Sequence, residues 1–281
     1  MKKESRDDMS IIAFLILTWN SEDYIENCLD SILAFKRFNV KIYIVDNGST
    51  DSTVGKIESF SDDRIQLIKL PENVGTTVSR NIALNKIPKT VDYICILDSD
   101  TIVNEIAFET LTKVLDQNHS IGIIGPQMQN SKGVVQNSGR NLPSLRIKIA
   151  KVLPFKVIQN YGVEMEKPST RIIDGLQDVP YLLSACWVLR RATVDNIGRF
   201  DEKIFYAPED VDYCVRSWIK GMRVVFCRNV SIIHEYQRIS KKKLLSKINF
   251  LHLIGLAYYF KKYRYFYDGE RFFEYLQGLN K

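Results

Sequence analysis

The sequence has few cysteines and histidines, and their spacing argues against two classes of small stabilised domain. Five cysteines and three histidines are scattered over 281 residues, and no two cysteines form a C-x-x-C pair. An odd number of distant cysteines, most of them inside apolar runs, indicates reduced core residues rather than disulfides. A structural zinc site would need closely spaced Cys and His ligands, which this sequence does not offer.

Three further features are missing. Residues 1–8 are charged and lack the apolar core of a signal peptide, and no apolar stretch approaches the length of a membrane-spanning helix. We therefore expect a cytoplasmic protein with a flexible tail at residues 1–9. No G-x-G-x-x-G motif follows the first predicted strand, which argues against a classical dinucleotide-binding fold.

The composition is that of an ordinary soluble globular protein, with 45% apolar and 26% charged residues. The length allows one large α/β domain or two small ones. The formal net charge of +6 is modest, and much of the excess lies in the last fifth of the chain. We expect no nucleic-acid partner.

Apolar runs and helical patterns alternate along the chain. Strands are predicted at residues 10–17, 41–45, 65–70, 93–97, 121–125, 179–189, 223–227 and 230–233. Helices are predicted from about residue 22, after residue 51, and at 78–84, 106–117 and 208–218. This alternation predicts an α/β fold with a mostly parallel sheet and helices on both faces.

The regular pattern fades between residues 126 and 177. This region contains several Gly, Pro, Asn and Ser residues and a basic patch formed by Arg140, Arg146, Lys148 and Lys151. We expect loops and short strands that shape a substrate site.

A D-x-D motif, Asp98-Ser99-Asp100, directly follows the apolar strand predicted at residues 93–97. The carboxyl ends of parallel strands are where open α/β sheets bind ligands. Carboxylate oxygens at that edge suit Mg²⁺ or Mn²⁺, and a cation there can hold a diphosphate. The alternative is a polar turn that caps the next helix.

A second acidic pair opens the helix that begins near Pro208. Its buried stripe is formed by Val211, Cys214, Val215 and Trp218. Helical periodicity puts Glu209 opposite this stripe and Asp210 at its border, so Asp210 is better placed to point into a cleft. The alternative is that both acids complement the helix dipole. His234 ends the last predicted strand, a position where a lone histidine is more often structural.

Motifs occur in a fixed order over about residues 10–236. They are Leu17-Thr18-Trp19-Asn20, Val45-Asp46-Asn47-Gly48-Ser49-Thr50-Asp51, Asn73-Val74-Gly75, Arg80-Asn81, Leu97-Asp98-Ser99-Asp100, Ile197-Gly198-Arg199-Phe200-Asp201-Glu202, Glu209-Asp210-Val211-Asp212 and His234. This set closely resembles the family 2 glycosyltransferases, and most of all bacterial rhamnosyltransferase-type members of cell-surface polysaccharide synthesis. The resemblance implies a GT-A fold over residues 10–236, a nucleotide-diphosphate-sugar donor, Mg²⁺ or Mn²⁺, and inversion at the anomeric carbon.

The resemblance also implies roles for single residues. The nucleotide pocket would be lined by Thr18, Asn20, Asp46, Asn73 and Arg80, with Asp46 reading the pyrimidine base. Asp98 would contact the ribose or the metal, and Asp100 and His234 would be metal ligands. Asp210 would be the general base, with Glu209 as the alternative.

The chemistry of glycosyl transfer needs such groups. Negative charge builds on the departing diphosphate, and a bound cation stabilises it by several kcal/mol. The acceptor hydroxyl loses its proton on the opposite face of the sugar, where one carboxylate suffices. The base must therefore lie on a different element from the D-x-D.

The substrates follow less directly. By resemblance we expect dTDP-rhamnose first and a UDP-sugar next, with a glycan or polyprenyl-linked acceptor. Pro208, where relatives often have glycine, and Ala185-Cys186-Trp187 depart from the usual pattern and leave the acceptor open. The rival hypotheses are a nucleotidyltransferase, which would need a glycine-rich loop in place of residues 18–21, and a non-catalytic nucleotide-sugar-binding scaffold, which would not need the acids and histidine together.

Residues 237–281 form a basic and aromatic extension that is predicted to contain one or two helices. Its apolar stretch, residues 248–260, is too short to cross a bilayer, and lysines and tyrosines flank it. This pattern favours a helix in the membrane interface and therefore peripheral contact with the inner leaflet. The alternative is a helix packed on the catalytic domain or across a homodimer interface.

Overall fold

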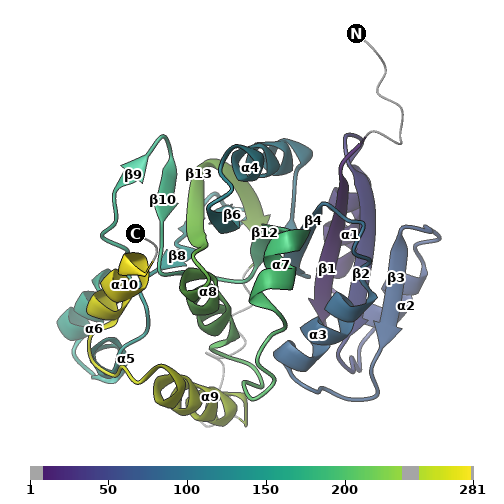
Figure 1. Ribbon diagram of the computed structural model, residues 1–281. Helices are drawn as coiled ribbons and strands as arrows, with labels where there is room; N and C mark the ends of the chain where they lie inside the picture. Colours follow the sequence, from purple (N-terminus) through teal and green to yellow (C-terminus); the bar gives the residue numbers. More distant parts are fainter. Residues whose placement is uncertain (1–8, 236–246, 280–281) are drawn as a thin grey trace.

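A mixed eleven-stranded sheet forms the centre of the computed structural model, which describes residues 9–235 and 247–279 (Figure 1). Its main path runs in the order β3 (Ile65–Lys69), β2 (Asn39–Asp46), β1 (Ile11–Thr18), β4 (Tyr93–Asp98), β12 (Cys186–Arg190), β6 (Ile121–Gln129), β13 (Arg223–His234), β10 (Leu176–Asp178) and β9 (Ile172–Ile173). The short strands β5 (Thr101–Ile102) and β7 (Val135–Gln136) pair with β13 and β6. A separate pair joins β8 (Gly139–Arg140) and β11 (Tyr181–Leu182).

The N-terminal half of the sheet is parallel, from β3 through β2 and β1 to β4. One face is covered by α1 (Ile25–Leu33), α2 (Thr53–Glu58) and α4 (Glu105–Gln117). The other face is covered by α3 (Thr76–Lys86), α7 (Arg191–Ile197) and α8 (Glu209–Ile219). Continuous apolar strands such as β1 are buried on both faces by these layers. The predicted α/β fold with helices on both faces is confirmed.

The C-terminal half departs from a simple parallel order. β12 runs antiparallel to both β4 and β6, while β13 is parallel to β6. Residues 179–189, predicted as one strand, form two, because β11 leaves the main sheet to pair with β8. The two strands predicted at 223–233 are one strand, β13, with a register shift between Cys227 and Ser231.

Residues 126–177 contain two helices that the sequence pattern did not predict, α5 (Leu145–Val152) and α6 (Lys156–Glu164). Ser144 begins α5 as its N-cap and accepts a hydrogen bond from the Ile147 backbone N–H. In α5, Ile147 and Ala150 are buried but Ile149 is 56% exposed, and Val157 of α6 is 81% exposed. The apolar residues of this helical hairpin are thus divided between core and surface. The periodic signal of a core-facing helix is therefore missing.

Two C-terminal helices, α9 (Lys247–Tyr263) and α10 (Gly269–Gly278), pack on the rest of the fold. Tyr259 and Phe260 of α9 lie in the same core cluster as α8, and Lys262 donates hydrogen bonds to Asp201 and Asp212 at 2.6 Å. This is the packing that the sequence left as the alternative to a membrane helix. Among the described ranges, no helix combines the length and hydropathy required to cross a bilayer. Residues 1–8 of the predicted tail and the lysines at 241–243 lie outside the described residues, and the homodimer stays a prediction.

Two phenylalanines on α9 test whether this helix belongs to the core. Phe260 is 4% exposed and Phe250 is 65% exposed. Phe260→Ala is expected to lower the free energy of unfolding by about 3–5 kcal/mol, because it leaves a cavity beside α8. Phe250→Ala is expected to change it by less than about 0.5 kcal/mol. Urea unfolding of both variants measures the difference, and equal effects would contradict the packing of α9.

Candidate active site

A cavity of about 500 Å³ opens where the carboxyl ends of β1 and β4 meet the N-terminus of α8. Its walls contain Asp98 and Asp100 from the D-x-D, His234 from β13, and Glu209 and Asp210 from α8. The location is the one expected for a ligand site in an open α/β sheet. The structure therefore gathers both acidic motifs of the sequence around one space.

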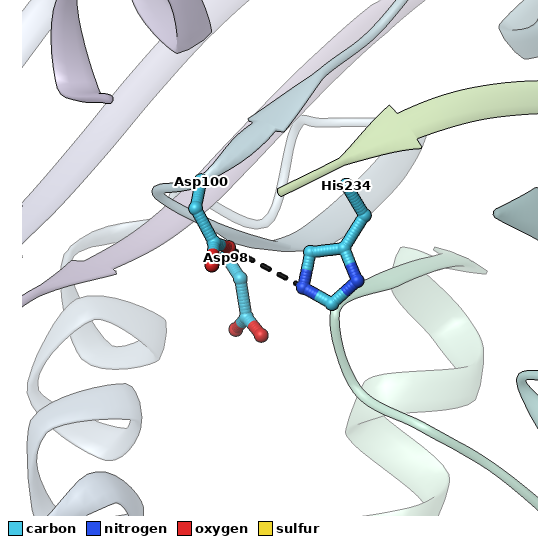
Figure 2. A group of neighbouring side chains, drawn as sticks. All are labelled: Asp98, Asp100 and His234. Carbon is cyan, nitrogen blue, oxygen red and sulfur yellow. Dashed lines mark ion pairs between the residues drawn. The ribbon is translucent and has the colours of Figure 1, made fainter. Parts of the chain in front are cut away.

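Asp98, Asp100 and His234 form a cluster at one wall of the cavity (Figure 2). One ligand atom from each residue lies within 4.8 Å of the others, and Asp100 Oδ1 is 3.4 Å from His234 Nε2. β5 follows the D-x-D and pairs with the end of β13, which places Thr101 opposite His234. Two carboxylates and an imidazole are a donor set that fits Mn²⁺ or Mg²⁺.

Gln136 of β7 holds the far side of the histidine ring. Its Oε1 lies 2.8 Å from His234 Nδ1, and its Nε2 donates to the His234 carbonyl at 2.7 Å. With Oε1 as the acceptor, Nδ1 carries the ring proton and Nε2 presents its lone pair toward the two aspartates. Sequence reasoning missed Gln136, because it comes from the region without a regular pattern.

Arg80 of α3 connects the two acidic motifs. Its guanidinium is buried, with Nη2 at 3.4 Å from Asp98 Oδ1 and Nη1 at 3.2 Å from Glu209 Oε1. Nη2 also donates to Ser184 Oγ at 3.0 Å, and the guanidinium lies over the Phe200 ring. The side chain predicted to line the nucleotide pocket thus also ties β4 to the first turn of α8.

Glu209 lies opposite the apolar stripe of α8, yet it is buried. The cavity wall covers this face, since Arg80 and Ser184 both contact the Glu209 carboxylate. Asp210 also lines the cavity, and within the described residues no side chain donates a hydrogen bond to it. Glu209 is therefore held in an ion pair, and Asp210 is the carboxylate available to a ligand.

Burial raises the pKa of several of these acids. It raises the pKa of Glu209 to about 8, with Asp210 adding to the shift and Arg80 opposing it. It also raises the pKa of Asp210, against the Val211 backbone N–H and nearby cations, and that of Asp98 to about 6. Clustered carboxyls with raised pKa values in a cleft are typical of catalytic sites.

The predicted base reader, Asp46, ends β2 in a buried hydrogen-bond network. Its carboxylate accepts hydrogen bonds from Thr18 Oγ1 and from the Ser49 backbone N–H, both at 3.0 Å. Asp46 and Thr18 do not line the cavity in this structure. Their contact with a nucleotide base stays a prediction.

Of the other residues predicted for the nucleotide pocket, Asn73 and Arg80 line the cavity and Asn20 does not. Trp19 and Asn47 line it instead, although sequence reasoning gave neither a role. Each is adjacent in sequence to a predicted residue, so the motifs located the correct loops. The conformation of each loop determines that Trp19 rather than Asn20, and Asn47 rather than Asp46, lines the cavity.

Arg80→Met tests the buried ion pair. We expect it to lower the free energy of unfolding by about 3 kcal/mol, because Glu209 loses its partner while remaining buried, and the partly exposed Asp98 loses a charged contact as well. At a pH above these raised pKa values, Glu209 and Asp98 are ionised in the original protein and Arg80 stabilises their charge. In the variant the same charges have no cation beside them. The loss should thus be larger at about pH 9 than at about pH 6.

Arg37→Met is the matched control, because Arg37 pairs with Glu109 at the surface and is 69% exposed. Its effect is expected to stay below about 1 kcal/mol. Denaturant unfolding at both pH values measures the free energy of unfolding of the two variants. A similar decrease in both would show that the buried ion pairs of Arg80 do not stabilise the fold.

Several known proteins have sequences similar to this one. The sequence model described as glycosyl transferase family 2 matches residues 13–198. An N-acetylglucosaminyl-diphospho-decaprenol L-rhamnosyltransferase of Mycobacterium tuberculosis is 26% identical over 238 residues, which cover 80% of this chain and 76% of that protein. A teichoic acid poly(glycerol phosphate) polymerase of Staphylococcus epidermidis is 32% identical over 122 residues, 42% of this chain and 16% of that protein.

Solved structures show the same fold at lower identity. S. aureus TarS 1–349 in complex with UDP-GlcNAc superposes with a TM-score of 0.57 and 20% identity over 83% of this chain. The mannosyltransferase PcManGT from Pyrobaculum calidifontis, with GDP-Man and Mn²⁺, gives a TM-score of 0.56 and 18% identity over 84%. The chain spans about three fifths of each of these two structures. With a family match over well over half of its length and the GT-A fold, the chain belongs to glycosyl transferase family 2 and is a glycosyltransferase.

Proposed function

We propose that this enzyme transfers a sugar from a nucleotide-diphosphate donor to a glycan or polyprenyl-linked acceptor with inversion at the anomeric carbon. The observation that carries the proposal is the arrangement of one cavity. The metal-type cluster of Asp98, Asp100 and His234 forms one wall, and Asp210 lines the same space from α8. Donor activation and proton removal are thereby assigned to different elements.

The donor end uses the cluster at the sheet edge. Asp98, Asp100 and His234 would hold Mg²⁺ or Mn²⁺, which when bound stabilises the negative charge of the departing diphosphate. Gln136 keeps the His234 ring oriented for this role. Arg80 keeps the D-x-D strand in place through Asp98.

The acceptor end uses the start of α8. Asp210 accepts the proton of the attacking hydroxyl, while the Glu209 carboxylate is occupied by its ion pair with Arg80 and is less available to the acceptor. Attack from the face opposite the leaving diphosphate inverts the anomeric configuration, as in inverting glycoside hydrolases. Burial, which raises the pKa of Asp210, strengthens it as a base relative to an exposed aspartate.

The relatives support a choice of substrates. The M. tuberculosis relative is named for L-rhamnosyl transfer to a decaprenol-linked sugar, so we propose dTDP-rhamnose as the first donor to test. The TarS structure holds UDP-GlcNAc, so UDP-sugars come next. The M. tuberculosis relative is named for a decaprenol-linked sugar and the S. epidermidis relative for teichoic acid, and on this basis we propose a role in cell-surface polysaccharide synthesis at the inner leaflet. Exposed apolar side chains on α9, including Phe250 and Leu253, would supply the membrane contact.

Release of nucleotide from a panel of nucleotide sugars in the presence of Mn²⁺ separates this proposal from its rivals. A glycosyltransferase releases the nucleoside diphosphate slowly when water takes the sugar and faster when an acceptor is present. A scaffold releases none, and a nucleotidyltransferase turns over only with a sugar phosphate and a nucleoside triphosphate. Either of the last two results would replace the proposed function.

Asp210→Asn tests the base. We expect the transfer rate to fall by about 10²–10⁴-fold while donor affinity stays nearly unchanged, because a proton acceptor is lost and no metal ligand is. Asp195→Asn, at an exposed position of α7, is the control and should retain full activity. Transfer kinetics and donor titration measure the two quantities. Equal loss of donor binding would show that Asp210 has a different role.

The metal cluster is tested by Mn²⁺ binding in the presence of a nucleoside diphosphate, followed by electron paramagnetic resonance. Asp100→Asn removes a ligand and should nearly abolish binding. Gln136→Leu leaves the ligands but releases the His234 ring, so Mn²⁺ affinity should fall by about 10–100-fold. Gln66→Leu on the exposed side of β3 is the control. Unchanged affinity in Asp100→Asn would exclude this cluster as the metal site.

A further inference from the structure

The cavity has a basic wall that the proposed chemistry does not use. It is formed by Arg140 of β8 and by Lys148 and Lys151 of α5, all of which line the same cavity as Asp210. Glu166 is the acid paired with this group, with its carboxylate 2.7 Å from Lys151 Nζ and 3.9 Å from Arg140 Nη1. Three cations thus share one directly paired carboxylate.

Lys148 is the cation of this group that lacks a direct partner. Within the described ranges, its ammonium has no hydrogen bond or ion pair, although it is only partly exposed. Burial lowers the pKa of Lys148, and Lys151 and Arg140 lower it further, against Glu166 and Asp210. A surplus of positive charge withdrawn from water is unfavourable unless an anion joins it.

The basic wall lies at the acceptor end of the cavity. Arg140 and Lys148 are among the groups that lower the pKa of Asp210. The charged groups that act most strongly on Asp98 are different ones, namely Arg80, Asp100, His234 and Asp210 itself. The geometry agrees: Arg140 lies opposite Tyr181 in the β8–β11 pair, and β11 packs against α8, the helix that carries Asp210 in its first turn. The basic wall is therefore on the side of the cavity where the proposed base lies.

We propose that Arg140, Lys148 and Lys151 bind the diphosphate that links the acceptor sugar to its lipid. The inference rests on the proposed function and narrows its acceptor to a lipid-diphosphate-linked sugar. Arg and Lys side chains are the usual partners of phosphate oxygens, and Arg140 can bind two of them at once. Because the basic wall adjoins Asp210, the attacking hydroxyl belongs to the sugar bonded directly to the diphosphate, not to the distant end of a long glycan.

The surroundings of the basic wall fit a lipid. Leu251 and Leu256 of α9 line the same cavity as Lys148 and Lys151, so α9 adds apolar side chains to the lining. Exposed apolar side chains continue outward from both elements: Leu153, Phe155 and Val157 from the α5–α6 hairpin, and Phe250, Leu253 and Ile254 from α9. Figure 1 shows these helices on one side of the molecule. An apolar chain leaving the diphosphate would cross this surface.

Inorganic pyrophosphate is the probe for the site itself. The full chain is titrated with it by calorimetry in EDTA, so that no divalent cation holds the probe at the donor end. We expect binding that weakens about tenfold or more in Lys148→Gln and in Lys151→Gln. Lys113→Gln, an exposed position on α4, and Asp100→Asn should bind as the original protein does. No binding by the original protein, or a loss only in Asp100→Asn, would overturn the proposal.

The acceptor assay identifies the source of the phosphate. With a sugar linked to a polyprenyl diphosphate, Lys151→Gln should raise KM about tenfold or more and leave kcat nearly unchanged, because Lys151 is not among the cations that act on the Asp210 carboxylate. When the same sugar is offered as an alkyl glycoside without a diphosphate, the original protein and the variant should show the same low kcat/KM. Donor hydrolysis should be the same in both, so loss of hydrolysis marks a failure of the proposed function instead. If phosphatidylglycerol vesicles bind through Lys148 and pyrophosphate does not, the wall binds phospholipid headgroups and the proposal is wrong.

Discussion

The buried guanidinium of Arg80 is the contact on which the site geometry depends. A charge withdrawn from water needs partners, and Arg80 finds them in Asp98 at the end of β4 and Glu209 at the start of α8. The helix that carries Arg80 is fixed at its own N-terminus, where Thr76 donates its backbone N–H to the Phe205 carbonyl at 2.7 Å. Gly75 has a positive φ there, and a side chain would lie 2.5 Å from that carbonyl oxygen. α3, the loop before α8 and the D-x-D strand are thereby fixed relative to one another.

This arrangement divides the cavity by charge. Carboxylates and a histidine form the wall at β4 and β13, where a cation would be held, while Arg140, Lys148 and Lys151 form the wall beside Asp210. Two diphosphates, one on the donor and one on the acceptor, would then meet different positive partners. The sugar being transferred would lie between them, close to Asp210. The cations also act on the proposed base. Burial raises the pKa of Asp210, and Arg140 and Lys148 lower it, so they help to keep this carboxylate ionised and able to accept a proton.

Much of the fold and part of the site could be predicted from the sequence, because several site residues are next to a strand or helix end that the local pattern reveals. Asp98 and His234 end strands, Glu209 begins a helix, and Asp100 lies two residues past β4; such positions gather at one edge of an α/β sheet. Gln136 comes from chain without a regular pattern, its position is set by the pairing of β7 with β6, and no spacing indicates it. The sequence indicated a basic patch that includes Lys148 and Lys151, but not where tertiary packing places these side chains. Likewise, an apolar stretch such as 248–260 does not say whether protein or lipid covers it. The structure shows that protein covers Tyr259 and Phe260, while Phe250 remains exposed.

The central claim is that the leaving diphosphate and the proton acceptor lie on opposite faces of the transferred sugar. The anomeric configuration of the first-formed product tests it most directly, measured by proton NMR with whichever nucleotide sugar the enzyme turns over. The account predicts that the configuration is inverted relative to the donor, because displacement takes place in one step with Asp210 as base. A product that retains the donor's configuration would contradict it.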